Sequence, residues 1–155
     1  MTLYLVRHGH AGTRGRFEGP DIDRPLSDKG HHQAEAVAAD LRGARVEQVM
    51  SSRAVRCQQT VGPVARERGL DVEVHPALTE GTSAPATATL LLQLAADDVD
   101  AVLSSHGDVI PAALAALRAD GVAVDDHWAL PKGTYYVLDV DDGEITGARF
   151  VDPRP

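Results

Sequence analysis

The chain has 155 residues, of which 43% are hydrophobic and 25% are charged, which is enough for one domain with its own core over residues 1–155. The formal net charge of −8 argues against nucleic acid and anionic membranes as main partners. A single cysteine, Cys57, excludes an internal disulfide, and neither a membrane-spanning stretch nor a signal peptide is visible, so we predict a cytoplasmic protein.

The first part of the chain predicts a strand, a long loop and an amphipathic helix. Residues 2–6 are an apolar run without alternation, which is typical of a strand buried on both faces. A loop without hydrophobic periodicity follows over residues 9–25. Ser27 is a favourable N-cap, and we expect the helix behind it to end near Gly43. Its buried face is indicated by apolar residues at helical spacing, namely Ala34, Val37, Ala38 and Leu41.

The middle of the chain repeats the alternation of strand and helix. Residues 46–50 predict a second strand, and residues 53–68 predict a second helix that is kinked or interrupted at Pro63. Residues 71–74 predict a short third strand, followed by a loop over residues 75–85. A third helix is predicted to bury Ala88, Leu91, Leu92 and Ala95.

The last part of the chain ends in a different pattern. Residues 101–103 predict a fourth strand, and Asp108 is expected to cap a fourth helix that buries Ile110, Ala113, Leu114 and Leu117. Two strand-like runs, 134–140 and 144–151, are joined by Asp141-Asp142-Gly143, which is typical of a β-hairpin. This order predicts a three-layer α/β/α fold with a mostly parallel sheet and a C-terminal antiparallel hairpin.

Polar residues follow each predicted parallel strand at the point where it ends. Because the carboxyl ends of parallel strands meet at one edge of a sheet, we expect these residues to converge although they are distant in sequence. They are Arg7 and His8 after the first strand, Ser52 and Arg53 after the second, Glu80 after the third, and His106 and Gly107 after the fourth.

Two arginines, two histidines and a carboxylate at one edge point to phosphoryl transfer. Guanidinium groups match phosphate oxygens in a bidentate way, and cationic donors around the transferring group supply most of the catalysis. A neutral histidine such as His8 can attack phosphorus through one ring nitrogen, provided that an acceptor holds the proton on the other. A tight turn at Gly9 would supply a backbone carbonyl for that purpose. Glu80 would protonate a poor leaving group.

These motifs resemble those of the histidine phosphatase superfamily, which has the phosphoglycerate-mutase-like fold. The likeness rests on Arg7-His8-Gly9, Ser52-Arg53 and His106-Gly107, together with Leu26-Ser27-Asp28-Lys29-Gly30 and Gln33-Ala34, and it covers nearly the whole chain. It implies that His8 becomes phosphohistidine and that Arg7, Arg53, His106 and Gly107 hold the phosphoryl group. It implies no metal and no cofactor. In many relatives an acidic residue near Glu80 is the proton donor, whereas the short SixA-type phosphohistidine phosphatases need none.

A closer likeness is to the C-terminal phosphatase domain of two-domain MutT-type Nudix hydrolases. The similar segments are 24–27, 56–61, 78–81, 105–111 and 132–134. No Nudix motif is present, so this likeness does not imply hydrolysis at a Nudix site.

Several other residues have both a functional and a plainer interpretation. The pair His31-His32 lacks further metal ligands and is expected to face solvent. Cys57 lies on the inward face of the second predicted helix and is expected in the core. The loop and helix arginines either line the site or are simply solvated, and Trp128 lines the entrance or anchors a loop. These arginines are Arg14, Arg16, Arg24 and Arg56.

The sequence therefore predicts a metal-independent phosphatase that works through a phosphohistidine intermediate on His8. The segment between Glu80 and the third helix is too short for the insertions of sugar-phosphate mutases, so an open site is expected. This fits a phosphoprotein, such as a phosphohistidine domain, or a small phosphorylated molecule such as an ester or a nucleotide. The alternatives are a phosphoglycerate-mutase-type phosphotransferase and a non-catalytic module that binds phosphorylated ligands. The sequence carries no indication of an oligomeric state.

Overall fold

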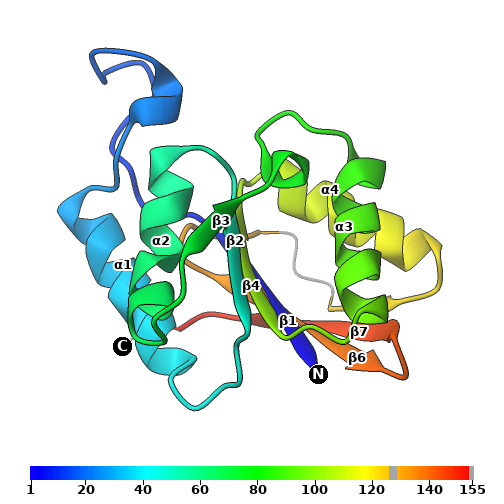
Figure 1. Ribbon diagram of the computed structural model, residues 1–155. Coiled ribbons are helices and arrows are strands. Elements are labelled where there is room, and N and C mark those ends of the chain that lie inside the picture. Colours follow the sequence, from blue (N-terminus) through cyan, green and yellow to red (C-terminus); the bar gives the residue numbers. More distant parts are fainter. Residues whose placement is uncertain (126–128, 154–155) are drawn as a thin grey trace.

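The apolar segments of the sequence assemble into one mixed sheet (Figure 1). The computed structural model describes residues 1–125 and 129–153, so the prediction for Trp128 falls outside the described residues. Within those ranges the sheet has seven strands in the order β3-β2-β4-β1-β6-β7-β5. The strands are β1 (Thr2–Arg7), β2 (Gln48–Ser51), β3 (Val72–Val74), β4 (Ala101–Ser105), β5 (Ala123–Val124), β6 (Tyr135–Asp141) and β7 (Glu144–Val151).

Strand β1 lies at the point where the sheet changes from parallel to antiparallel pairing. It pairs in parallel with β4 and antiparallel with β6, so both of its edges are hydrogen-bonded. On one side of it, β4, β2 and β3 are parallel, and on the other side β6 and β7 form the predicted hairpin. The predicted mostly parallel sheet with a C-terminal antiparallel hairpin is therefore confirmed.

Two pairs of helices cover the two faces of the sheet. Helices α1 (Asp28–Asp40) and α2 (Val55–Arg66) lie on one face, and α3 (Ala84–Ala96) and α4 (Val109–Ala119) lie on the other (Figure 1). Strand side chains alternate between the two resulting cores, because successive residues of a strand point to opposite faces. Leu5 packs in the core beneath α3 and α4, whereas Val6 packs in the core beneath α1 and α2. The three-layer prediction is thereby confirmed.

The helix termini follow the predicted capping signals in part. The Ser27 hydroxyl accepts the Gly30 N–H at 3.1 Å and starts α1. Asp108 occupies the N-cap of α4, but its carboxylate makes no capping bond and instead accepts the Gly81 N–H at 3.0 Å. Pro63 lies inside α2 without ending it, and that helix begins at Val55 rather than at Arg53.

Three features of the structure differ from the sequence prediction. Leu92 is 44% exposed, because the buried face of α3 is rotated toward Leu90 and Leu94. Strand β5 was not predicted, since it consists of only two residues, both of which pair with β7. The predicted loops contain two single-turn 3₁₀ helices, η1 (Asp21–Asp23) and η2 (Pro76–Leu78).

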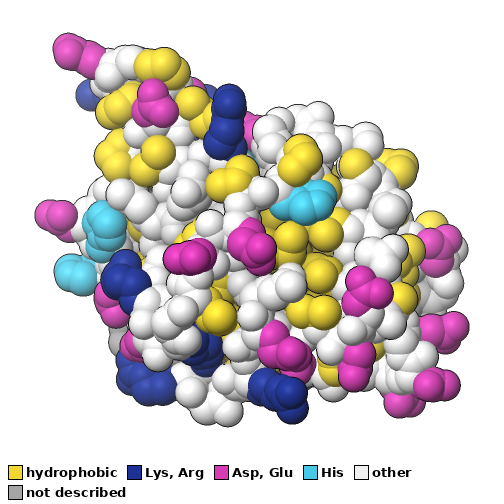
Figure 2. All heavy atoms as spheres, in the orientation of Figure 1, with side chains coloured by type: hydrophobic (Ala, Val, Ile, Leu, Met, Phe, Trp, Pro, Cys, Tyr) yellow, Lys and Arg dark blue, Asp and Glu magenta, His cyan; other side chains and the backbone are white. Residues whose placement is uncertain are grey.

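The surface agrees with the acidic composition. Asp and Glu side chains are spread over much of the face drawn in Figure 2. None of the helices in the described ranges combines the length and the apolar composition that a bilayer crossing requires. A cytoplasmic location stays a prediction.

Candidate active site

The two histidines of the predicted site follow neighbouring strands. His8 comes after β1 and His106 after β4, and the last residues of these strands, Arg7 and Ser105, are paired in the sheet. The two imidazole ring centroids are 5.4 Å apart, and the rings meet edge to face at 67°. Parallel pairing thus brings together side chains that are almost a hundred residues apart in sequence.

His8 is oriented by the turn that follows β1. Its side chain is buried, and its Nδ1 lies 2.8 Å from the Gly9 carbonyl oxygen. A carbonyl only accepts, so Nδ1 carries the hydrogen and Nε2 keeps its lone pair. Burial, reinforced by the charges of Arg56, His106 and Arg7, lowers the pKa of His8 to about 3 and outweighs the hydrogen bond to Gly9, which raises it. The ring is therefore neutral, with a nucleophilic Nε2, at physiological pH.

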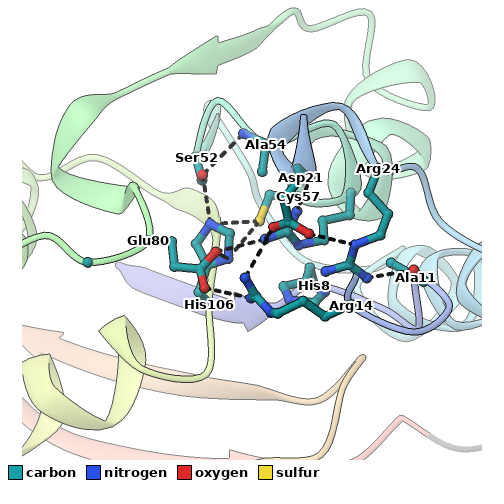
Figure 3. Close-up of polar contacts among 12 residues, drawn as sticks. His8, Ala11, Arg14, Asp21, Arg24, Ser52, Ala54, Cys57, Glu80 and His106 are labelled. Carbon is teal, nitrogen blue, oxygen red and sulfur yellow. Dashed lines mark hydrogen bonds and ion pairs between the residues drawn. The ribbon is translucent and has the colours of Figure 1, made fainter. Parts of the chain in front are cut away.

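His106 is held between a buried hydroxyl and a carboxylate. Its Nε2 lies 2.8 Å from the Ser52 Oγ, and its Nδ1 lies 3.8 Å from the Glu80 Oε2 (Figure 3). Burial, followed by the charge of Arg56, lowers the pKa of His106 to about 4, although the carboxylates of Glu80 and Asp108 act to raise it. His106 is consequently a second neutral imidazole.

The guanidinium group of Arg7 lies directly against the turn between β4 and α4. A Cβ added to Gly107 would approach the Arg7 guanidinium atoms to 2.7–2.9 Å, so a side chain at this position would displace the guanidinium group. Arg7 donates from Nη1 to the Leu130 carbonyl at 2.5 Å, while its buried Nε has no partner among the described residues. Burial lowers the pKa of Arg7, against the effect of Asp108.

The second arginine at the site is Arg56 and not the predicted Arg53. Arg53 lies just before α2, where its side chain is exposed. Arg56, in the first turn of α2, is only 1% exposed and donates from Nη2 to the Glu80 Oε2 at 2.9 Å. Its buried Nε, like that of Arg7, has no partner in the described ranges. The structure thus brings Arg56, and not the predicted Arg53, to the site, because the turn between β2 and α2 leaves Arg53 exposed to solvent. The binding of phosphate by either arginine stays a prediction.

A signal for Arg56 was present in the sequence. Arg56 and Thr60 are one helical turn apart on the inward face that also includes Cys57. In the structure the Thr60 hydroxyl donates to the Arg56 carbonyl at 2.7 Å and accepts the Gly9 N–H at 2.9 Å. The inward helical face, rather than the end of the strand, therefore carries the arginine.

The loop after β1 folds back toward Glu80 through a group of ion pairs. Arg14 donates to the Glu80 Oε1 at 2.6 Å, so both oxygens of this carboxylate accept guanidinium N–H groups. Asp21 lies 3.3 Å from both Arg14 and Arg56 and accepts from the buried Arg24 at 2.9 Å (Figure 3). These contacts place Arg14, Arg24 and Arg56 at the site.

The remaining candidates are either exposed or buried in the core. Arg16 is exposed on the loop, and His31 and His32 are exposed on α1. Cys57 is fully buried, with its Sγ 3.5 Å from the His106 Nε2, and burial raises the pKa of this thiol to about 12, which agrees with a core role. No cluster of His, Cys, Asp and Glu able to hold a metal ion occurs within residues 1–125 and 129–153.

This chain is similar in sequence to proteins that are named for acting on phosphorylated molecules. A sequence model described as the histidine phosphatase superfamily (branch 1) matches residues 3–84. The 8-oxo-(d)GTP phosphatase of Mycolicibacterium smegmatis is 34% identical over 155 aligned residues, covering 98% of this chain and 48% of that protein. The probable phosphoglycerate mutase GpmB of Enterobacter sp. is 35% identical over 82 residues, covering 52% of this chain and 38% of the mutase. This chain thus spans less than half the length of these curated relatives.

Solved structures share the fold over nearly the whole chain. A putative phosphohistidine phosphatase SixA from Agrobacterium tumefaciens has a TM-score of 0.72 at 27% identity, covering 97% of this chain and 95% of that one. The protein histidine phosphatase SixA complexed with tungstate has a TM-score of 0.75 at 21% identity, covering 97% and 94%. The predicted phosphoglycerate-mutase-like fold and the likeness to the short SixA-type proteins are confirmed. The likeness to a domain of Nudix hydrolases stays a prediction.

Proposed function

This chain belongs to the histidine phosphatase superfamily (branch 1), and on that premise we propose that it is a metal-independent phosphatase that forms a phosphohistidine on His8. The family and the phosphatase-named relative agree with the predicted enzyme class, a hydrolase acting on phosphate groups. The observation that carries the proposal is the bond from the His8 Nδ1 to the Gly9 carbonyl at 2.8 Å. It leaves a neutral ring with the Nε2 lone pair available for attack.

In the first step the His8 Nε2 attacks phosphorus in line with the leaving group. The new P–N bond forms as the bond to the leaving group breaks, and the leaving atom keeps the electron pair. Arg7, Arg56 and His106, together with the backbone of Gly107, surround the place where negative charge is dispersed, as electrostatic catalysis of phosphoryl transfer requires. The unpartnered Nε groups of Arg7 and Arg56 support this role.

Glu80 serves as proton donor when the leaving atom is a poor leaving group. At rest its two oxygens accept N–H groups from Arg14 and Arg56. Phosphoryl oxygens compete for the same guanidinium groups, so substrate binding would loosen these contacts. The freed carboxylate can then take up a proton from solvent, and it is this proton that passes to the leaving atom. A phosphohistidine substrate has a nitrogen leaving group that protonates easily and does not need this proton.

In the second step a water molecule attacks the phosphorus of the phosphohistidine. The P–N bond breaks, its electron pair returns to the His8 Nε2, and inorganic phosphate leaves. Glu80 takes the proton from the attacking water and then releases it to solvent. The enzyme then returns to its starting state without a metal ion.

The substrate is a phosphorylated small molecule or a phosphoprotein. Only residues 79–83 separate η2 from α3, so this side of the site has no insertion that would close over a sugar phosphate. A mutase-type phosphotransferase, suggested by the GpmB relatives, has less support for that reason. A non-catalytic binding module has less support because it would not require the free Nε2 of His8.

The test is hydrolysis of p-nitrophenyl phosphate by the wild type, His8→Ala and, as a matched control, His31→Ala. We expect His8→Ala to lose on the order of 10³-fold or more in kcat/KM, whereas replacing the exposed His31 leaves activity unchanged. Rapid quenching should trap an acid-labile, alkali-stable phosphohistidine in the wild type only. Undiminished hydrolysis by His8→Ala would refute the nucleophile. Wild-type turnover only in the presence of a bisphosphate primer would identify a mutase.

A further inference from the structure

The His106 ring faces two different environments, and its tautomer decides what it presents to the substrate. The Nε2 side meets Ser52 and Cys57, which are 1% and 0% exposed. The Nδ1 side faces Glu80 (Figure 3), and the Glu80 carboxylate accepts an N–H group from Arg56. A neutral imidazole has one N–H and one lone pair, so only one of its two nitrogens can donate a hydrogen bond and the other accepts one.

The surroundings of Ser52 favour donation of its proton to His106. The Ser52 Oγ already accepts the Ala54 N–H at 3.2 Å, which leaves one lone pair and the hydroxyl hydrogen. The Nε2 of His106 is 2.8 Å away, and the Cys57 thiol is directed to the Ser105 carbonyl at 3.7 Å. When the Ser52 hydroxyl donates its hydrogen bond to the Nε2 lone pair, the hydroxyl group, Nε2 and the Ala54 N–H all have a hydrogen-bond partner.

The opposite nitrogen gives the same answer independently. The Glu80 Oε2 lies 3.8 Å from Nδ1, and a carboxylate is attracted to an N–H but repelled by a lone pair. A phosphoryl oxygen on this side of the ring would experience the same preference. The two contacts therefore agree on a ring with hydrogen on Nδ1 and a lone pair on Nε2.

We propose that Ser52 is a positioning residue that donates its hydroxyl hydrogen to the His106 Nε2 and thereby directs the Nδ1–H of His106 toward the transferring phosphoryl group. The catalytic part of this inference rests on the proposed phosphatase function. Ser52 itself lies behind the ring and acts through His106, because its hydroxyl contacts Nε2 and the Ala54 N–H. The proposal explains why a serine at the end of β2 is fully buried beside the site.

The direct test is the tautomer of His106 in ¹⁵N-histidine-labelled protein without substrate. Long-range ¹H–¹⁵N correlation at pH 7.5 distinguishes a nitrogen that carries hydrogen from one that does not, and the spectrum of His106→Gln assigns the signals. We expect Nδ1 to be protonated in the wild type and in Ser52→Thr, which keeps the hydroxyl. Ser52→Ala should shift the ring toward the Nε2–H form.

Ser51→Ala is the matched control, since it also removes a buried hydroxyl from the end of β2. The Ser51 Oγ donates to the Ser52 carbonyl at 2.7 Å and does not contact His106, so its loss should leave the tautomer in place. In steady-state kinetics we expect Ser52→Ala to lower kcat/KM at least tenfold and Ser52→Thr to restore most of it.

A wild-type His106 with hydrogen on Nε2 would overturn the proposal, even if Ser52→Ala failed to fold. An unchanged tautomer in folded Ser52→Ala would overturn it as well. Failure of the phosphatase proposal would give a different result. No phosphohistidine would then form on His8, although the tautomer of His106 would still depend on Ser52.

Discussion

Arg53 and Arg56 differ in environment although only two residues separate them in sequence. Arg56 is buried and bonded to Glu80, whereas the Arg53 side chain is exposed. We expect Arg56→Ala to lower kcat/KM for an aryl phosphate by about 10²–10³-fold, because one preorganised charged donor is lost from the transition state. Arg53→Ala should change kcat/KM by less than about threefold. Steady-state kinetics, with circular dichroism to verify folding, distinguishes the two variants.

Arg56→Lys refines this comparison because it keeps the charge but loses the planar fork. Its activity should fall between those of the wild type and Arg56→Ala. If Arg53→Ala were the more damaging substitution, the assignment of the second arginine would return to Arg53.

Some residues of the site could be predicted from the sequence and others could not. His8, His106 and Arg7 directly follow or end strands, and strand order alone brings them to one edge. Arg56 depends on where α2 begins and which way its first turn points, which a strand-end rule does not capture. The contacts of Arg14 arise in a loop without periodicity, so no repeating pattern in the sequence indicates them.

At the scale of elements, long periodic segments were predictable and short ones were not. The helices and the central strands have apolar patterns that extend over several residues, and their types and order follow from those patterns. Strand β5 contains only Ala123 and Val124, and it exists because β7 offers it an edge. The N-cap carboxylate of Asp108 instead accepts the Gly81 N–H from another loop, which is a tertiary contact that local capping rules do not include.

The turn between β4 and α4 gives a prediction at this scale. In Gly107→Ala the new Cβ would lie 2.7–2.9 Å from three atoms of the Arg7 guanidinium group, closer than such contacts allow. Arg7 would have to move, and its bond to the Leu130 carbonyl would be lost with it. We expect kcat/KM to fall on the order of 10²-fold, since misplacing a charged donor by about 1 Å is enough for such a loss. Enzyme kinetics with a thermal melt would measure the effect.

Gly62→Ala provides the control for this substitution. Gly62 lies inside α2, where an added Cβ meets only the flexible end of Arg66 at 3.2 Å. Alanine at such a helical position is expected to raise the free energy of unfolding by up to about 1 kcal/mol without changing kcat/KM. Equal activity in both variants would show that Arg7 does not depend on the Gly107 contact.

At the scale of the whole molecule, an acidic chain builds a cationic site in its interior. The net charge is −8, yet Arg7, Arg56 and Arg24 gather at the carboxyl edge of the sheet, where they contact backbone carbonyls or carboxylates. The two histidines contribute neutral rings instead of further positive charge. Protonating these two rings at low pH would add positive charge beside the buried arginines, so acid should destabilise the folded protein.

The free energy of unfolding should consequently fall with pH below the ordinary pKa of histidine. Burial lowers the pKa of His8 to about 3 and of His106 to about 4, so the unfolded chain binds protons from about pH 6.5 downward that the folded protein does not. Each histidine then contributes a slope of about 1.4 kcal/mol per pH unit to the free energy of unfolding, which is absent above pH 6.5 and develops as the pH falls toward 4.

Urea unfolding at pH 7.5, 6.5, 5.5 and 5.0 measures this slope. His106→Gln should remove about half of this slope between pH 6 and 5, whereas His31→Gln, at a position exposed in the folded protein, should leave it unchanged. A wild-type slope near zero in this range would mean that the two rings bind protons as readily in the folded protein as in the unfolded chain.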